Sequence, residues 1–297
     1  MKSNKRQQRI LRLLLFAIVL IAAILLTIYY IELGREEPVL GTGSQLGLAV
    51  LFIDVGQADS ALIYLSTGET MLIDAGESPG ADAIREELDE RRITDIDILV
   101  ATHPHADHIG GMRTLIEHYD IGQVLMPDME IQSAVYKNLM DVINSRGIPV
   151  NEAYAGYEFS LGNARCTVVS PDADADKDAN NESVVIFLDF FESEFLFTGD
   201  MENWAETRVL DAYYYVDADV LKVAHHGSST SSSQAFLDAV TPQYAVISCG
   251  RDNKYGHPHQ ETLERLEAAG AKVYRTDEAG DILFFSDGQT LTVQTGD

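Results

Sequence analysis

Four potential metal ligands stand within six residues of the sequence, in the stretch Thr102-His103-Pro104-His105-Ala106-Asp107-His108. The apolar run before it, 96–101, has the composition of a buried strand. Pro104 prevents a regular helix through the cluster, so the loop can turn His103 and His105 toward one point and Asp107 and His108 toward a neighbouring one. Imidazole and carboxylate ligands together predict a binuclear hydrolytic site, in preference to a surface loop with accidental histidines.

Three later strand ends carry further acids and histidines. They are Thr198-Gly199-Asp200, His225-His226-Gly227-Ser228 and Tyr255-Gly256-His257-Pro258-His259, each after an apolar run. Strand ends are where folds of mixed strands and helices gather functional side chains. Taken alone, Asp200 could equally cap the helix that is expected from Glu202.

A membrane span is predicted near the N-terminus. The segment 13–31 contains no charged residue and would extend about 28 Å as a helix, close to the thickness of the bilayer core. Five basic residues precede it and predict a cytoplasmic tail at 1–12, which would place the rest of the chain outside the membrane. A cleaved signal peptide is the alternative, but the run is long for one and lacks a small-residue cleavage site. Residues 32–46 have the composition of a linker.

Composition limits the partners that the remaining residues can bind. Beyond the tail, 16 basic residues face 47 acidic ones, a net charge of −31. Such a charge makes a large basic nucleic-acid-binding face improbable, although a metal cluster can still hold one phosphate. The two cysteines, Cys166 and Cys249, stand in apolar runs and are expected to be buried thiols.

The patterning of 47–297 predicts one domain of the α/β or α+β class, with sheets covered by helices. Strands are expected at 48–55, 60–65, 70–73, 96–101, 166–169, 183–190, 194–197, 220–223, 244–247, 272–274, 282–285 and 290–293. Helices are expected at 80–92, 108–119, 132–146, 202–211, 232–240 and 260–269. The stretch 171–182 is expected to be an exposed acidic loop.

Six motifs, in this order, resemble those of the metallo-β-lactamase superfamily and, more narrowly, the detached C-terminal hydrolase domain of ComEC-type competence proteins. They are Phe52-Ile53-Asp54-Val55-Gly56-Gln57-Ala58-Asp59-Ser60, Leu72-Ile73-Asp74-Ala75-Gly76, the cluster 103–108, Phe197-Thr198-Gly199-Asp200, the segment 221–228 and Tyr255-Gly256-His257-Pro258-His259. The resemblance covers 47–285 and implies a four-layer αββα sandwich with metals at one edge of the sheets. It further implies two divalent ions, zinc or manganese.

The resemblance also implies roles for single residues. His103 and His105 would bind the first ion, Asp107 and His108 the second, and Asp200 would bridge them. A histidine of the pair His225-His226 would complete the second site, and which of the two does so stays open.

Two departures from the family pattern bear on this assignment. Ala179 stands where many members have a third histidine for the first ion, so that only Asn180 or Asn181 could add an oxygen there. A weaker first site, more open to manganese, is therefore expected. Ala58 replaces a usual glycine, which would matter only if the backbone there needs positive φ.

Metal-assisted hydrolysis is the expected mechanism, with Asp107 orienting the attacking water. Lys222 would either join a core-side network or neutralise a substrate phosphate. Of His257 and His259, one would donate a proton to the leaving group or hold a phosphate oxygen, the alternative being a helix-start loop. Asp74 is expected to orient a metal-binding histidine.

The expected function is that of a membrane-anchored, extracytoplasmic hydrolase, a phosphodiesterase or nuclease acting on phosphodiesters such as single-stranded DNA. The expected location is the cell membrane, with a single span. A small-ester hydrolase of the phosphorylcholine esterase, lactonase or β-lactamase type is the first alternative. A noncatalytic envelope interaction module is the second.

Overall fold

The computed structural model describes residues 47–172 and 178–296, which contain two sheets. The first holds β1 (Leu48–Phe52), β2 (Ala61–Leu65), β3 (Thr70–Ile73), β4 (Asp95–Val100), β5 (Asp120–Met126), β6 (Val150–Glu152), β14 (Ile282–Ser286) and β15 (Leu291–Thr295). The second holds β7 (Glu158–Leu161), β8 (Ala164–Ser170), β9 (Val185–Phe190), β10 (Ser193–Phe197), β11 (Val220–Lys222), β12 (Tyr244–Ile247) and β13 (Lys272–Arg275). Their orders are β15-β14-β1-β2-β3-β4-β5-β6 and β13-β12-β11-β10-β9-β8-β7.

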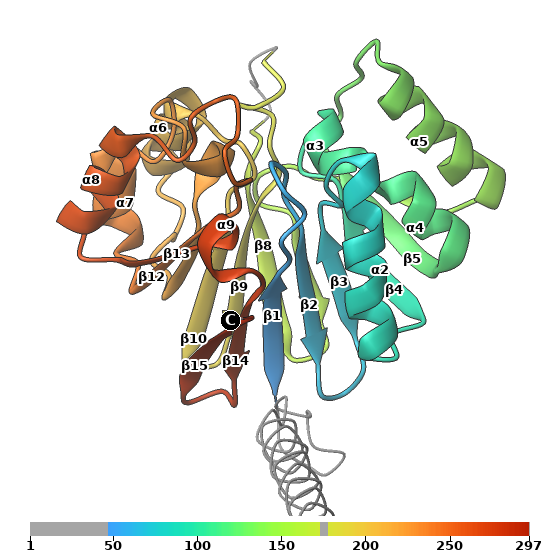
Figure 1. Cartoon of the computed structure of the whole chain (residues 1–297), viewed down its shortest axis with the longest axis horizontal. Coiled ribbons are helices and arrows are strands. Elements are labelled where there is room, and N and C mark those ends of the chain that lie inside the picture. The colour runs from blue at the N-terminus through green and yellow to red at the C-terminus, as the bar shows by residue number, and fades with distance from the viewer. Residues whose placement is uncertain (1–46, 173–177, 297) are drawn as a thin grey trace, which may run out of the picture. The chain divides into compact units, whose positions relative to one another are not determined.

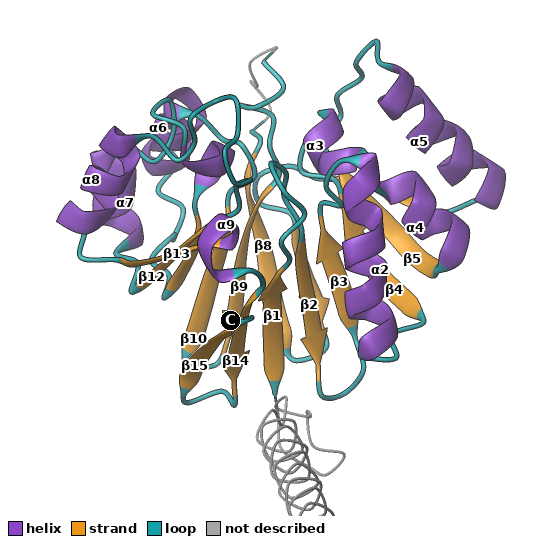
Figure 2. Ribbon diagram, in the orientation of Figure 1, coloured by secondary structure: helices purple, strands orange, loops and turns teal. Residues whose placement is uncertain are grey.

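Helices cover the outer face of each sheet. The helices are η1 (Ser78–Gly80), α2 (Ala81–Glu90), α3 (Ala106–Ile109), α4 (Met112–His118), α5 (Ala134–Arg146), α6 (Asn203–Asp211), η2 (Ala224–Gly227), α7 (Gln234–Val240), α8 (Gln260–Ala268) and α9 (Thr276–Ala279). Helices α2 to α5 lie beside the first sheet and α6 to α8 beside the second (Figures 1 and 2). The described residues thus have a helix, sheet, sheet, helix arrangement, a mixed α/β fold as the sequence predicts.

Alternating side chains of the strands form the core between the sheets. In β10, Phe195 and Phe197 face the core shared by the two sheets, whereas Leu196 faces the core under α6, α7 and α8. The rings of Phe52 and Phe197, one from each sheet, lie 6.0 Å apart between centroids. This period of two is what a strand buried on both faces requires, and it fixes which strand ends meet at the edge of the sandwich.

The structure corrects several predicted elements. The helix expected at 108–119 is two helices, α3 and α4, separated at Gly110 and Gly111. A Cβ at Gly111 would lie 2.2 Å from the carbonyl oxygen of Ala75, so this glycine allows the helix junction to approach the end of β3. The first strand ends at Phe52 rather than at 55.

Strands β5, β6 and β7 were not predicted, because they lack a sustained apolar run and have largely exposed or half-exposed residues. Both cysteines are buried and free, as expected.

The predicted tail, membrane span and linker lie outside the described residues. Within 47–172 and 178–296, none of the helices combines the length and the apolar character that crossing a bilayer requires.

The close approach at Gly111 makes a first prediction. Gly111→Ala will lower the free energy of unfolding by about 1 to 3 kcal/mol, because the added methyl group forces two backbone segments apart. Gly296→Ala is the matched control, since a Cβ there meets nothing nearer than 3.4 Å. Urea unfolding of both variants measures the difference. Equal stability of the two variants would show that the backbone at the junction accommodates the methyl group without loss of stability.

Candidate metal centre

The predicted site residues come together at the carboxyl ends of strands from both sheets. Parallel strands β3 and β4 end just before Asp74 and the 103–108 loop, and parallel strands β10 and β11 end just before Asp200 and the His225-His226 pair. Because parallel neighbours end at the same edge, each sheet contributes two adjacent groups of polar side chains. The short helix α3 then carries Asp107 and His108 (Figure 1).

Asp200 occupies the middle of the cluster. Its Oδ1 lies 3.3 Å from Nε2 of His108 and 3.9 Å from Nε2 of His226. Its Oδ2 lies 3.9 Å from Nε2 of His103 and 3.8 Å from Nε2 of His225. The capping alternative does not apply, because α6 begins at Asn203 with Glu202 at its N-cap. Each oxygen of Asp200 therefore faces a different set of imidazoles.

One of these sets is a compact group of ligand atoms. Atoms of Asp107, His108, Asp200 and His226 all lie within 4.8 Å of one another. Nε2 of His108, Nε2 of His226 and Oδ1 of Asp200 are buried and have no hydrogen-bond partner. Unpaired buried nitrogen and oxygen atoms that face one point are costly unless something binds there, and their chemistry suits a divalent ion. The residues present therefore fit a metal ion at this position.

Asp74 and Thr102 fix the orientation of the His108 ring. Nδ1 of His108 lies 2.7 Å from Oδ2 of Asp74, and the other oxygen of Asp74 accepts the Thr102 amide at 2.9 Å. This contact fixes the ring so that Nε2 faces Asp200. Asp74 thus lies where the sequence placed it, as a partner of a histidine, while Thr102 was missed.

His226 is held in the same manner by residues that the sequence analysis missed. Its Nδ1 lies 2.9 Å from the Ser248 carbonyl oxygen and 3.2 Å from Oδ1 of Asp59. Its Nε2 lies 3.4 Å from Oδ2 of Asp107. Asp59 lies in the motif 52–60, next to the end of a buried strand. This position was the signal in the sequence from which its role could have been predicted.

The carboxylates and imidazoles stabilise each other's charge. Burial alone would raise the pKa of Asp200, but the imidazoles of His108 and His226 hold the pKa of this carboxyl well below its ordinary value. Burial also opposes the charge of His226, yet Asp200 and Asp59 raise the pKa of this imidazole to about 10. Buried carboxylates that stabilise positive charge so strongly are suited to a divalent cation, which competes with protons for the imidazoles.

Lys222 lies in the core-side network, the first of its two expected positions. Its Nζ donates to Oδ2 of Asp59 at 2.6 Å and to the Val223 carbonyl at 3.0 Å, and only 5% of the residue is exposed. Burial alone would raise the pKa of Asp59, but the Lys222 ammonium and the His226 imidazole lower it to about 2. Contact with a substrate phosphate would require the ammonium to leave this pair, so the geometry favours the core-side alternative, in which Lys222 positions Asp59.

His257 and His259 lie in different surroundings. His257 lines the pocket over the centre, and its ring is 5.6 Å from that of His225 and nearly parallel to that of Tyr255. Burial and the neighbouring imidazoles of His226 and His225 lower the pKa of His257 to about 4. His259 is the N-cap residue of α8, and its Nδ1 accepts the Ser229 amide at 2.9 Å. The helix-start alternative therefore describes His259, and the pocket position belongs to His257.

The pocket over the centre has a volume of about 600 Å³ and is lined by both acidic and basic side chains. Asp107, His105 and Asp200 line it together with Lys254 and Tyr255. Arg251, the other basic residue nearby, donates instead to the Asp277 carbonyl.

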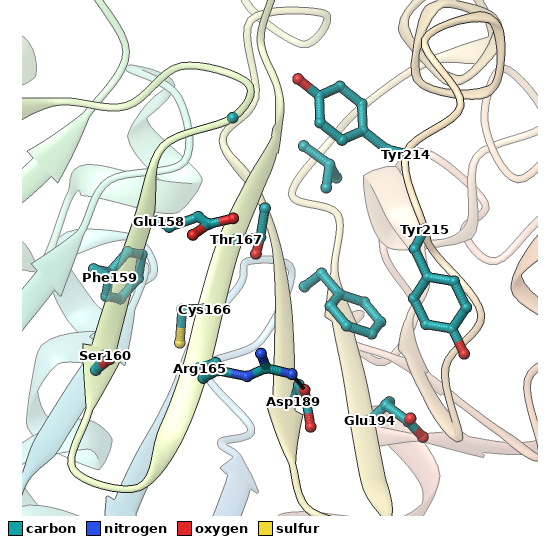
Figure 3. A pocket seen from close by; sticks show the side chains of 13 residues that line it. Glu158, Phe159, Ser160, Arg165, Cys166, Thr167, Asp189, Glu194, Tyr214 and Tyr215 are labelled. Carbon is teal, nitrogen blue, oxygen red and sulfur yellow. Dashed lines mark hydrogen bonds and ion pairs between the residues drawn. The ribbon is translucent and has the colours of Figure 1, made fainter.

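A second hollow of about 650 Å³ lies elsewhere, on β7 to β10 beside Tyr214 and Tyr215 (Figure 3). Arg165 and Asp189 form an ion pair there. The residues that line it include none of the predicted site residues and no histidine.

The two departures in the sequence have different consequences. Ala58 is buried and does not have a positive φ, so its Cβ causes no backbone strain. Ala179 carries no ligand atom, but the neighbouring Asn180 lines the pocket with a buried Oδ1 that has no hydrogen-bond partner.

Comparison with known proteins agrees with this geometry. Residues 53–129 match the family model of the metallo-beta-lactamase superfamily. The chain contains a metallo-beta-lactamase domain. It is 29% identical over 249 residues to ComE operon protein 3 of Bacillus subtilis, covering 78% of this chain and 32% of that protein. It is 30% identical to Recombination protein 2 of Haemophilus influenzae and to Competence protein ComA of Neisseria gonorrhoeae, over 79% and 80% of this chain and 29% and 32% of those proteins.

The last of these relatives is named a competence protein, and the chain spans about a third of the length of each. Among solved structures, the metallo hydrolase Igni18 of Ignicoccus hospitalis aligns with a TM-score of 0.53 at 15% identity, over 80% of this chain and 98% of that one. CmlA, a diiron beta-hydroxylase of Streptomyces venezuelae, aligns with a TM-score of 0.52 at 16% identity, over 77% and 52% of the two chains. At such identities the likeness shows the shared fold alone.

The buried Lys222–Asp59 pair makes a second prediction. Lys222→Ala will lower the free energy of unfolding by about 3 to 5 kcal/mol, because it leaves a buried carboxylate without its cation. The double variant Lys222→Met with Asp59→Asn will recover much of that loss, since it removes both charges together. Urea unfolding of the three proteins measures the effect. A stable single variant with a raised KM for a phosphodiester would instead make Lys222 a substrate contact.

Proposed function

We propose that the domain is a metal-dependent phosphodiesterase with two divalent ions at the Asp200 centre. The observation that carries the proposal is the convergence of Asp107, His108, Asp200 and His226, with unpaired buried nitrogen and oxygen atoms directed to one point. When bound, divalent ions at such a centre lower the pKa of water toward neutrality and stabilise negative charge on a phosphoryl group. A noncatalytic module has no need of this many converging ligands.

Asp107 is the residue of the group that faces the substrate side. Its side chain is 30% exposed, whereas those of His226 and Asp200 are each 3% exposed. Burial alone would raise the pKa of Asp107, but the His226 imidazole, 3.4 Å away, and the charge of His108 hold this pKa well below its ordinary value. Asp107 therefore remains a carboxylate that accepts hydrogen bonds, which is what orienting an attacking water requires.

His257 is suited to hold a phosphate oxygen. Its Nδ1 is buried without a hydrogen-bond partner, and its low pKa keeps the imidazole neutral near pH 7. A neutral imidazole donates a hydrogen bond from one nitrogen without carrying a charge. We therefore assign His257 to binding the phosphoryl group rather than to protonating the leaving group.

Two residues that line the pocket, Lys254 and Tyr255, favour a nucleotide. Tyr255 is 54% exposed, and the Lys254 ammonium lies 4.8 Å from the centre of its ring. The ammonium lies over the face of this ring. If it turns to the adjacent phosphate, the exposed ring can stack a base. This supports single-stranded DNA as a substrate.

The second candidate is hydrolysis of a small phosphate ester. The net charge of −31 in the chain beyond its basic tail favours it, because such a charge repels long polyanions.

One set of assays separates these candidates. We expect hydrolysis of bis(p-nitrophenyl) phosphate and, with added manganese, of single-stranded DNA. Asp107→Asn will reduce both activities by about 100-fold or more, since the oriented water is lost. Asp82→Asn, at a side chain that is 86% exposed, is the matched control and will retain activity.

Salt distinguishes the two phosphodiester substrates. Cleavage of DNA should fall steeply as salt rises, whereas the small ester should respond weakly because it makes fewer phosphate contacts. Turnover of a cephalosporin alone would refute the phosphodiesterase proposal. No turnover of any substrate would favour the interaction module.

We also propose that the chain is anchored in the cell membrane with its hydrolase domain outside. The support is the uncharged segment 13–31 behind five basic residues. Protease added to intact cells will remove the domain, while a cytoplasmic marker protein survives. Persistence of the full-length chain, under conditions that digest a known external protein, would contradict this orientation.

A further inference from the structure

His225 lies on the opposite side of Asp200 from the compact group of ligand atoms. Its Nε2 is 3.8 Å from Oδ2 of Asp200, the oxygen that also lies 3.9 Å from Nε2 of His103. Two ligand atoms bound to one ion at about 2.1 Å each lie at most about 4.2 Å apart. Each imidazole is thus separately within reach of an ion held by this oxygen. Within the described residues His225 belongs to no group of three ligand atoms that all lie within 4.8 Å of one another, so an ion bound to both imidazoles would have to draw their side chains together. His226 faces the other oxygen of Asp200.

The surroundings of His225 repeat those of the other two histidines. Nδ1 of His225 faces Oε1 of Glu202 at 3.2 Å, as Nδ1 of His108 faces Asp74 and Nδ1 of His226 faces Asp59. A carboxylate on one ring nitrogen fixes the tautomer and directs the lone pair of the other nitrogen to a metal. Glu202 is fixed in turn by the Thr230 hydroxyl, which donates to it at 2.9 Å.

The backbone of the pair separates the two rings. His225 and His226 have φ values of 51° and 54°, in the left-handed region that costs free energy for residues other than glycine. Consecutive residues in this conformation direct the rings apart, and their centroids are 6.2 Å from each other. The strained turn therefore presents one imidazole to each oxygen of Asp200.

We propose that His225 is a ligand of the first divalent ion and replaces the imidazole that Ala179 cannot supply. Glu202 is its positioning residue. The first ion then has His103, His105, His225 and Asp200 as ligands, so the alanine does not weaken the site as the sequence alone suggested. Asn180, whose Nδ2 donates to Glu202 at 3.4 Å, is fixed with its unpaired oxygen in the same pocket.

This inference rests on the proposed binuclear centre, and metal counting tests it without substrate. Purified full-length protein is freed of metal with a chelator, titrated with Mn²⁺, and analysed for bound metal and for the electron paramagnetic resonance of coupled manganese pairs. The wild type will bind two ions per chain and give the signal of a coupled pair. His225→Ala will bind one ion and lose that signal.

Glu202→Gln keeps His225 and provides the second variant. It will still bind two ions, but the dissociation constant of the weaker one will rise by about 10 to 100-fold. His118→Ala is the matched control, because this histidine is exposed and its ring hydrogen-bonds to the Thr114 carbonyl of its own helix. It will behave as the wild type.

Two ions bound with wild-type affinity by both His225→Ala and Glu202→Gln would overturn the inference, whatever the catalytic assays show. A wild type that binds two ions in this His225-dependent way but hydrolyses no phosphodiester would overturn the proposed function and leave the inference standing.

Discussion

The buried carboxylate of Asp200 is the constraint on which the rest of the site depends. Its side chain is 3% exposed, and moving such a charge out of water is costly unless opposite charge surrounds it. Four imidazoles face its two oxygens, and the Ser183 hydroxyl accepts its backbone N–H at 3.0 Å. Gly199 before it has φ +51°, and a Cβ there would meet Ser183 and Thr102 at 3.0 Å. The turn after β10 is therefore shaped to place this one carboxylate.

The two sheets are joined beneath the site by a second buried charge. Asp59, from the segment between β1 and β2, receives Lys222 at the end of β11, so the pair links the first sheet to the second. The same carboxylate faces Nδ1 of His226. A change at Lys222 consequently affects both the stability of the sandwich and the direction of a metal-binding imidazole. This coupling explains how a lysine outside the pocket can matter to the site.

The sequence predicted those parts of the site that are local in the chain. The cluster 103–108 could be identified because composition and spacing within a few residues specify it. Asp200 was assigned to the centre through the family resemblance, since a helix cap explained it equally well. The separate directions of His225 and His226 could not, since they depend on two left-handed φ values that no pattern in the sequence indicates. Glu202 was interpreted only as a helix start, because its contact with His225 exists only in the folded loop. Strand β6 was missed since its pairing with β5 is fixed by the neighbouring strand rather than by its own residues.

The fold alone leaves the reaction open, because CmlA, titled a beta-hydroxylase, and the metallo hydrolase Igni18 share it with this chain. The assignment of a substrate must therefore come from the pocket and from charge. Beyond its basic tail the chain carries a net charge of −31, and Lys254 is the cation that the described pocket wall provides. If the domain is the phosphodiesterase proposed above, most of the positive charge that attracts its substrate must come from the divalent ions themselves. Substrate affinity should then depend on metal occupancy more strongly than in a hydrolase with a basic groove, because an acidic surface repels the same substrate once the ions are lost.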